Sequence, residues 1–161
     1  MNSFSFIILA NDNLISLENY NYTQLIGPSL IYFDDKTIFC EEGFIYENSV
    51  CLGHQAIAEY FGARLLNLDK VNHGISTEIS IVESDNMFNS IPKKINVGLY
   101  HSWFVDKEKL PRDLVITSVN EKGNIYSLKH SKLDIRGVQF HPESIMTENG
   151  LKMIENWIKL N

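Results

Sequence analysis

A cysteine stands in the sequence at a position suited to attack an amide or ester carbonyl. Cys51 lies in Ser49-Val-Cys-Leu-Gly53, with a small residue two positions before it and another two positions after it. Such spacing is typical of a nucleophile elbow, a strand-to-helix turn so tight that larger neighbours would collide. The pattern predicts that Cys51 is an exposed, strained nucleophile at a helix N-terminus, where the helix dipole favours the thiolate. The alternative interpretation is a buried structural cysteine.

His141 is the predicted base for that nucleophile. It follows the strand-like Val138–Phe140 and precedes Pro142, which ends the strand. The carboxyl ends of strands are where the sites of α/β proteins collect. Glu143 is placed to orient the imidazole, as the acid does in other catalytic triads. The backbone N–H of Leu52 is the predicted donor to an oxyanion. An isolated histidine of this kind is more often a surface or core residue, and its coincidence with an elbow in the same chain favours the catalytic interpretation.

The elements that must position these residues alternate between strands and helices. A helix is expected from Leu52 to about Gly62, and a second from Glu148 to Leu160 with Thr147 as its N-cap. Five strand-like runs lie between turn residues in the second half, and a first strand, a helix and a second strand are expected before the elbow. The five runs are Glu78–Glu83, Ile95–Tyr100, Leu114–Val119, Ile125–Lys129 and Ile135–Phe140. Before the elbow, the first strand is expected at Phe4–Ala10, the helix over 14–25 and the second strand at Leu30–Phe33. The pattern predicts an α/β domain with an antiparallel insertion.

Composition excludes several classes of protein. The chain has 161 residues, a length that favours one domain over residues 1–161, and its formal net charge is −6 with no basic stretch, which disfavours nucleic-acid binding. No apolar run reaches the roughly 18–20 residues of a membrane span. The first residues lack the basic start of a secretory signal, so the two cysteines are expected to be reduced thiols of a cytoplasmic protein. No zinc-ligand spacing or phosphate loop is present, so neither a metal nor a cofactor is expected.

Two motifs resemble those of the class I glutamine amidotransferases. Cys51-Leu-Gly-His-Gln55 resembles the nucleophile motif of that family, and Gly137-Val-Gln-Phe-His-Pro-Glu143 resembles its His/Glu motif. The resemblance is greatest to the glutaminase subunits of anthranilate synthase and aminodeoxychorismate synthase. Further similarity to that subgroup lies in His141–Gly150, Lys70–Gly74 and Tyr100–Trp103.

The resemblance implies a fold and a reaction. The fold is a mostly parallel central sheet flanked by helices, flavodoxin-like, with an antiparallel insertion. In the reaction, Cys51 attacks the side-chain amide of glutamine, His141 with Glu143 moves the proton, and ammonia passes to a partner synthase that uses chorismate. The matched positions imply that Gln55, Ser102 and Trp103 hold glutamine. They also imply that His73 and Gly74 face the synthase subunit.

The sequence departs from the family before the elbow. Between Asp35 and Val50 it lacks the family's third strand, its Gly-Pro-Gly loop and the helix that follows, a shortfall of roughly 30 residues, or one strand-helix unit. In the family that loop supplies the second oxyanion donor. The alternative to an active glutaminase is therefore a non-catalytic binding or regulatory subunit that has lost the loop. An eroded product that folds poorly is a third hypothesis.

Overall fold

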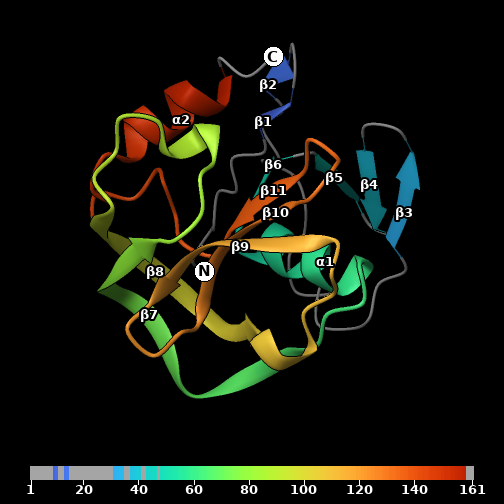
Figure 1. The fold of residues 1–161 in the computed structure, drawn as a ribbon, viewed down its shortest axis with the longest axis horizontal. Coiled ribbons are helices and arrows are strands. Elements are labelled where there is room, and N and C mark those ends of the chain that lie inside the picture. The colour runs from blue at the N-terminus through green and yellow to red at the C-terminus, as the bar shows by residue number, and fades with distance from the viewer. Residues whose placement is uncertain are drawn as a thin grey trace, which may run out of the picture.

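The computed structural model describes residues 48–158 continuously and five short segments before them, at 9–10, 13–14, 31–34, 37–40 and 43–46. Side chains are described for residues 50–157. Most of the strand expected over Phe4–Ala10 and of the helix expected over 14–25 lies outside the described residues. Figure 1 shows the continuous part as a curled sheet with a helix on either side.

The main sheet has six strands in the order β6-β11-β10-β9-β7-β8. Their bounds are β6 Asn48–Val50, β7 Leu65–Ile81, β8 Lys94–Val105, β9 Leu114–Asn120, β10 Ile125–His130 and β11 Arg136–Val138. Within this sheet only the β6–β11 pairing is parallel, and the other four are antiparallel. The expectation of a mostly parallel sheet is therefore wrong for the described residues. Short connections such as the 121–124 turn join neighbouring strands as hairpins, which are antiparallel by construction.

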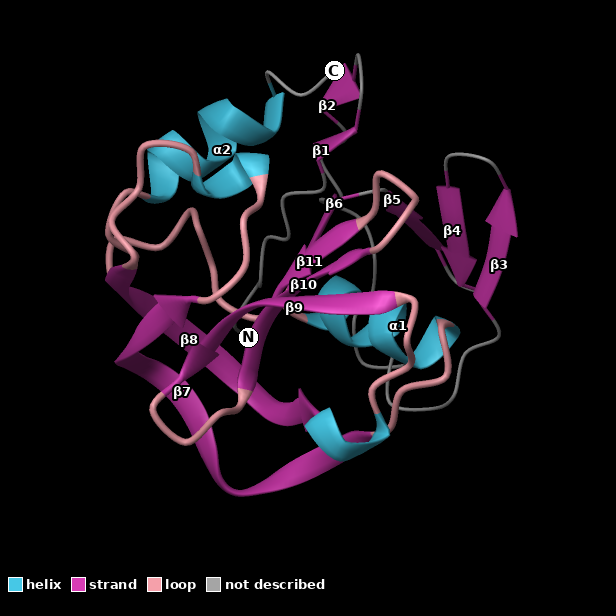
Figure 2. Cartoon of the chain, viewed as in Figure 1, coloured by secondary structure: helices cyan, strands magenta, loops and turns pink. Residues whose placement is uncertain are grey.

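The long strands β7 and β8 form a curved ribbon at one edge of this sheet (Figure 2). The sequence predicts only the last four residues of β7, from Glu78, because the part before them is largely polar and carries Gly74. The structure starts β7 at Leu65 and accommodates Gly74 at φ +66°, beside a register irregularity between His73 and Ile75. The bulge explains why hydrophobic alternation fails along this strand.

Two helices cover opposite faces of the sheet. Helix α1 spans Leu52–Tyr60, as expected from the sequence, and α2 spans Gly150–Ile158. The neighbouring β10 residues Ile125 and Tyr126 belong to different core clusters. Ile125 shares its cluster with Ile57 of α1, and Tyr126 shares its cluster with Trp157 of α2. Successive strand residues point to opposite faces, so each helix closes its own core. Single 3₁₀ turns occur at Asn86–Phe88 (η2) and Lys107–Lys109 (η3).

The segments before the elbow form small antiparallel sheets. Strands β3 (Ile31–Asp34), β4 (Thr37–Cys40) and β5 (Gly43–Tyr46) pair in that order, and β1 (Leu9–Ala10) pairs with β2 (Asn13–Leu14). The strand expected at Leu30–Phe33 is confirmed as β3 to within a residue. The described residues between Asp34 and Val50 belong to short strands, where the family has a strand-helix unit.

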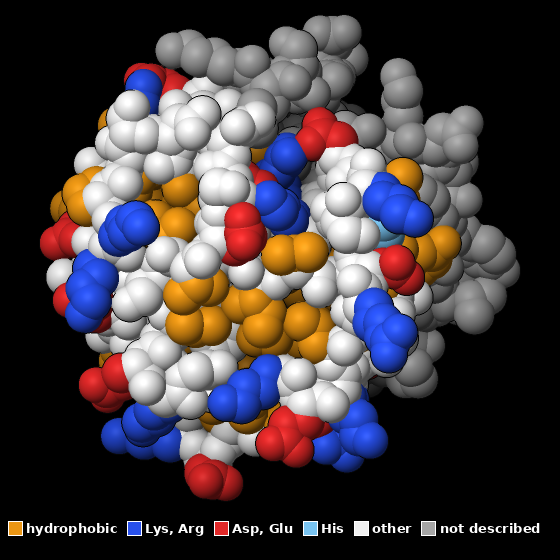
Figure 3. Space-filling view, viewed as in Figure 1, with side chains coloured by type: hydrophobic (Ala, Val, Ile, Leu, Met, Phe, Trp, Pro, Cys, Tyr) orange, Lys and Arg blue, Asp and Glu red, His pale blue; other side chains and the backbone are white. Residues whose placement is uncertain are grey.

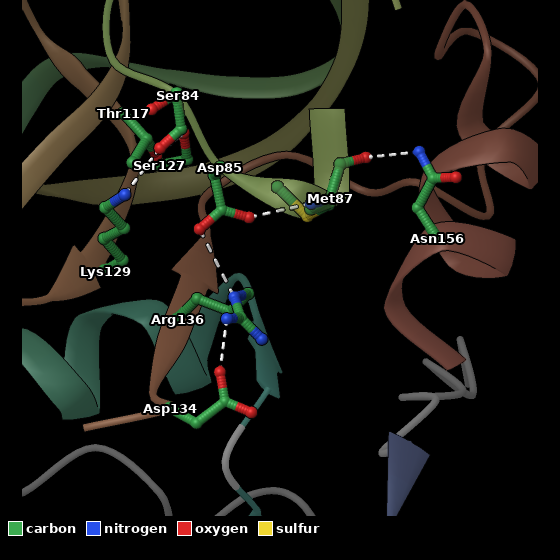
Figure 4. Close-up of polar contacts among 9 residues, drawn as sticks. All are labelled: Ser84, Asp85, Met87, Thr117, Ser127, Lys129, Asp134, Arg136 and Asn156. Carbon is green, nitrogen blue, oxygen red and sulfur yellow. Dashed lines mark hydrogen bonds and ion pairs between the residues drawn. The ribbon is translucent and has the colours of Figure 1, made fainter. Parts of the chain in front are cut away.

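Polar contacts hold β11, which leads into the His/Glu motif, against the loop that follows β7 (Figure 4). Arg136 donates from Nε to Asp85 at 3.4 Å and also bonds Asp134, and its side chain is 10% exposed. Asp85 in turn accepts from the backbone N–H of Met87 at 2.9 Å and begins η2. Asn156 of α2 donates to the Met87 carbonyl at 3.0 Å, so helix, loop and strand are tied together.

Replacing Asp85 with alanine is expected to destabilise the chain by about 3 kcal/mol, because a buried cation loses a partner and a 3₁₀ turn loses its cap. Urea unfolding measures this loss. The control is Glu78→Ala, which breaks an ion pair with Lys94 between two exposed side chains and should cost far less. Equal losses for the two variants would contradict the role assigned to the buried pair.

Charged side chains of both signs surround an apolar area on the face shown in Figure 3. On this face basic groups are interspersed with acidic ones. None of the helices in the described part of the chain is long and apolar enough to cross a membrane.

Candidate active site

Cys51 stands at the sharp turn between β6 and α1. Its backbone has φ 52° and ψ −98°, a positive φ that costs a non-glycine residue about 1–3 kcal/mol. Its N–H donates to the Val138 carbonyl at 2.7 Å, which fixes the turn against β11. The strained elbow therefore has the expected geometry. The side chain is buried, at 8% exposure, rather than exposed, because α1 and β11 pack around it.

His141 and Glu143 form a bonded pair just beyond β11. The imidazole Nδ1 lies 2.7 Å from Glu143 Oε1, with side chains 13% and 28% exposed. This bond leaves Nε2, a buried atom, as the nitrogen available to Cys51. Although burial lowers the pKa of His141, the adjacent Cys51 and Glu143 groups outweigh it and raise this pKa to about 9. The imidazole next to Cys51 is therefore protonated at neutral pH.

The segment after His141 is fixed to the edge strand β8. The His141 N–H donates to the Gly98 carbonyl at 3.1 Å, and the Thr147 hydroxyl donates to the His141 carbonyl at 2.6 Å while accepting from the Gly98 N–H at 3.0 Å. The expectation that Thr147 caps the last helix is wrong. Its hydroxyl bonds Gly98 and His141 instead, and α2 begins later, at Gly150.

Leu52 is the first residue of α1 and is 38% exposed. The first four N–H groups of a helix have no partner inside it. The Leu52 amide, next to the nucleophile, therefore has no partner inside the helix, and its role as an oxyanion donor stays a prediction.

The residues expected to hold glutamine are brought together only in part. Gln55 is buried, and its Nε2 donates to the Trp103 carbonyl at 2.9 Å and to Gln139 Oε1 at 3.1 Å. Trp103 on β8 is 43% exposed, and Ser102 beside it is half-buried. Trp103 therefore meets Gln55 through its backbone, and the amide nitrogen of Gln55 is committed to groups of the protein.

Gln139 is the residue of this site that the sequence motifs alone do not single out. It is fully buried, and its Nε2 donates to Cys51 Sγ at 3.6 Å. The signal available in the sequence is an amide between Val138 and Phe140, apolar residues of a strand expected to be buried. A buried amide needs partners, and those partners lie far away in the chain.

His73 lies on β7 and is exposed, with Gly74 beside it at the bulge. Its ring packs edge to face on Tyr100, at 5.4 Å between centroids, and Tyr100 packs in the same way on His141 at 5.1 Å. The two residues expected to face a synthase thus lie at the surface. The Tyr100 ring lies between the His73 ring and the His141 ring.

His54 lies in the first turns of α1, fully buried against Gly137, where an added Cβ would lie 2.9 Å from the His54 Cα. Burial lowers the pKa of His54 to about 4, with a smaller lowering from His101 and an opposing effect of a Gly137 backbone hydrogen bond. The ring is therefore neutral in the folded protein and does not compete with His141 for the role of base.

Acid should destabilise the fold through His54. Its folded pKa lies below the ordinary value of about 6.5, so the unfolded chain binds the extra proton first and stability falls as pH drops from 6.5 towards 4. The loss at pH 4 from this group is about 3 kcal/mol. Urea unfolding from pH 7 to 4.5 should show a shallower pH dependence for His54→Leu than for the unsubstituted chain, and an identical dependence would contradict the assignment.

Comparisons with known proteins show the family of the chain. The model of the family "Glutamine amidotransferase class-I" matches residues 49–160. A Haemophilus influenzae protein described as an anthranilate synthase component II is 37% identical over 139 residues, which cover 86% of this chain and 67% of that protein. An aminodeoxychorismate synthase component 2 of Klebsiella aerogenes is 39% identical over 109 residues, 68% of this chain and 58% of that protein.

A solved structure from Thermoplasma acidophilum, described as a GMP synthase subunit, superimposes with a TM-score of 0.64 and 28% identity. The superposition covers 70% of this chain and 55% of the Thermoplasma chain. The chain belongs to the class-I glutamine amidotransferase family, and its α/β fold is that of the family. It spans between 55 and 67% of the lengths of these relatives.

Proposed function

We propose that this chain is a glutaminase subunit that releases ammonia from glutamine for a synthase acting on chorismate. The observation that carries the proposal is the strained Cys51 beside the His141–Glu143 pair, joined at 2.7 Å. Relatives named after anthranilate and aminodeoxychorismate synthases support the partner class. In this proposal the chain works in the cytoplasm, without a cofactor and without contact with nucleic acid or membrane.

In the proposed reaction the Cys51 thiolate attacks the side-chain carbonyl carbon of glutamine, and the carbonyl oxygen becomes an oxyanion beside the Leu52 N–H. His141, protonated at neutral pH because its pKa is about 9, gives its proton to the departing ammonia. The product of this step is a glutamyl thioester. Neutral His141 then takes a proton from water, which attacks the thioester and releases glutamate and the thiolate.

The oxyanion site has one donor from the described residues, the Leu52 amide. The family's second donor lies in a Gly-Pro-Gly loop that this sequence lacks. Loss of one such donor typically slows the reaction about 10²–10³-fold. We therefore expect glutaminase turnover to be slow in the isolated chain.

The test mixes the purified chain with a chorismate-using synthase, either the anthranilate or the aminodeoxychorismate type, and measures glutamate. The proposal is supported if one of the two synthases raises glutamate formation and forms its chorismate-derived amine at the same time. The synthase that does so identifies the pathway that the chain serves. If the chain unfolds cooperatively, and is therefore folded, but forms no glutamate with either synthase, the proposal is contradicted.

The missing loop favours a second candidate, a non-catalytic subunit that binds the synthase and regulates it. In that case the synthase and the chain form a complex, measured by sedimentation, and no thioester forms on Cys51. Both candidate functions therefore predict that the chain binds the synthase, but only the glutaminase predicts a thioester on Cys51.

A further inference from the structure

We propose that Gln139 is a catalytic residue whose side-chain amide donates a hydrogen bond to the nucleophilic sulfur of Cys51. The proposal deepens the glutaminase function proposed above and rests on it. Gln139 is 0% exposed, and its two amide atoms have one partner each: Nε2 donates to Cys51 Sγ at 3.6 Å, and Oε1 accepts from Gln55 Nε2 at 3.1 Å.

The orientation of the Gln139 amide follows from the chemistry of its neighbours. The carbonyl oxygen of Trp103 only accepts hydrogen bonds, so the Gln55 atom 2.9 Å from it must be the amide nitrogen. That same nitrogen lies 3.1 Å from Gln139, which must therefore present its oxygen to Gln55. Its NH₂ group is left to face the sulfur. The backbone of Trp103 thus sets which end of Gln139 meets Cys51.

A donor at this position stabilises the thiolate more than the thiol, because a hydrogen bond to a charged acceptor is stronger than one to a neutral acceptor. Cys51 and Gln139 are both buried, and such bonds gain strength in the low-dielectric interior. The backbone of Gln139 is held as well, since its N–H donates to the Tyr126 carbonyl at 2.8 Å. The donor is thus pre-positioned, on the same short segment that carries His141.

Gln55 takes a different role here from the one the resemblance implies. Its amide nitrogen is used by two internal acceptors, and its side chain is buried. We assign it as a positioning residue for Gln139, acting on the sulfur only through that side chain.

The test is the rate at which iodoacetamide alkylates Cys51 as a function of pH. In this reaction the thiolate sulfur displaces iodide, so the rate reports the thiolate and needs neither glutamine nor a synthase. Peptide mass spectrometry counts Cys51 separately from Cys40. Failure of the glutaminase assay and failure of this test are therefore distinguishable.

Gln139→Glu keeps an acceptor for Gln55 and replaces the donor that faces the sulfur with a carboxylate, whose charge by itself also disfavours a neighbouring thiolate. We expect alkylation at pH 7 to be at least about tenfold slower, with the profile moved to higher pH. Gln139→Met, similar in length but without polar atoms, should slow it by about tenfold. Gln55→Met should have a smaller effect, and none when added to Gln139→Met, because Gln55 acts through Gln139.

A merely structural role predicts a different result. In that case the variants lower the unfolding midpoint and leave the alkylation profile of the folded chain unchanged. An unchanged profile in Gln139→Met, which removes the donor without adding a charge, would overturn the proposal. If Gln139→Met fails to fold, Gln139→Leu takes its place, and an unchanged profile in Gln139→Glu would overturn the proposal as well. Additive effects of the Gln55 and Gln139 substitutions would overturn the positioning role of Gln55.

Discussion

Replacing Cys51 with alanine is expected to abolish glutamate formation, with a loss of at least about 10⁴-fold, because the nucleophile and the thioester disappear together. The loss concerns chemistry rather than folding. Cys51 is a small buried residue whose turn is held by its own backbone N–H bond to Val138, and alanine retains that bond. The measurement is glutamate released in the presence of the synthase.

Cys40→Ala is the control within the same chain, since it removes the other cysteine and leaves the elbow intact. Its glutamate formation should equal that of the unsubstituted chain. Glutamate formation that survives Cys51→Ala would contradict the mechanism, because no other cysteine lies among the residues described around His141.

Gly150→Ala is expected to disrupt both stability and the site. A Cβ at this position would lie 1.9 Å from the carbonyl oxygen of Pro142, a backbone atom, so the 141–143 segment or the start of α2 must move. Overpacking of this kind costs about 3 kcal/mol. Because Pro142 joins His141 to Glu143, the movement also displaces the imidazole, and a displacement of about 1 Å is enough to slow a reaction about 10²-fold.

Leu151→Ala is the matched control, since Leu151 is the next residue of α2 and is 79% exposed. It should leave the urea unfolding curve and the rate nearly unchanged. A Gly150→Ala chain as stable and as active as this control would show that the contact of α2 with Pro142 does not position His141.

The parts of the candidate site that the sequence identifies are those that depend on patterns of neighbouring residues in the chain. Cys51 is found because an elbow demands small neighbours, and His141 with Glu143 because a proline ends their strand. Helix α1 follows from its apolar spacing. Each of these features depends on residues within a few positions of one another.

The features that the sequence does not reveal depend on pairing between distant segments. Gln139 meets Cys51 and Gln55 only because β11 lies beside β6 and α1. Thr147 is of a residue type common at helix caps, but contacts with Gly98 and the His141 carbonyl use its hydroxyl instead.

The expectation of a mostly parallel sheet is wrong for the described residues for a related reason. It rests on the family's N-terminal part, whereas four of the five pairings in the described six-stranded sheet are antiparallel. Strand β7 is predicted only in part because a bulge at Gly74 interrupts its alternation. Local propensity cannot place a bulge whose position is set by the partner strand.

The most direct test of the proposed nucleophile is covalent labelling of Cys51 by a diazoketone analogue of glutamine, followed by peptide mass spectrometry. The diazo carbon takes up a proton, and the thiolate then displaces dinitrogen and forms a thioether at the carbon next to the ketone. We expect one adduct, on Cys51, whose formation is prevented by an excess of glutamine. Failure to label Cys51, or labelling that glutamine does not reduce, would contradict the claim that this elbow is a glutamine-binding nucleophile site.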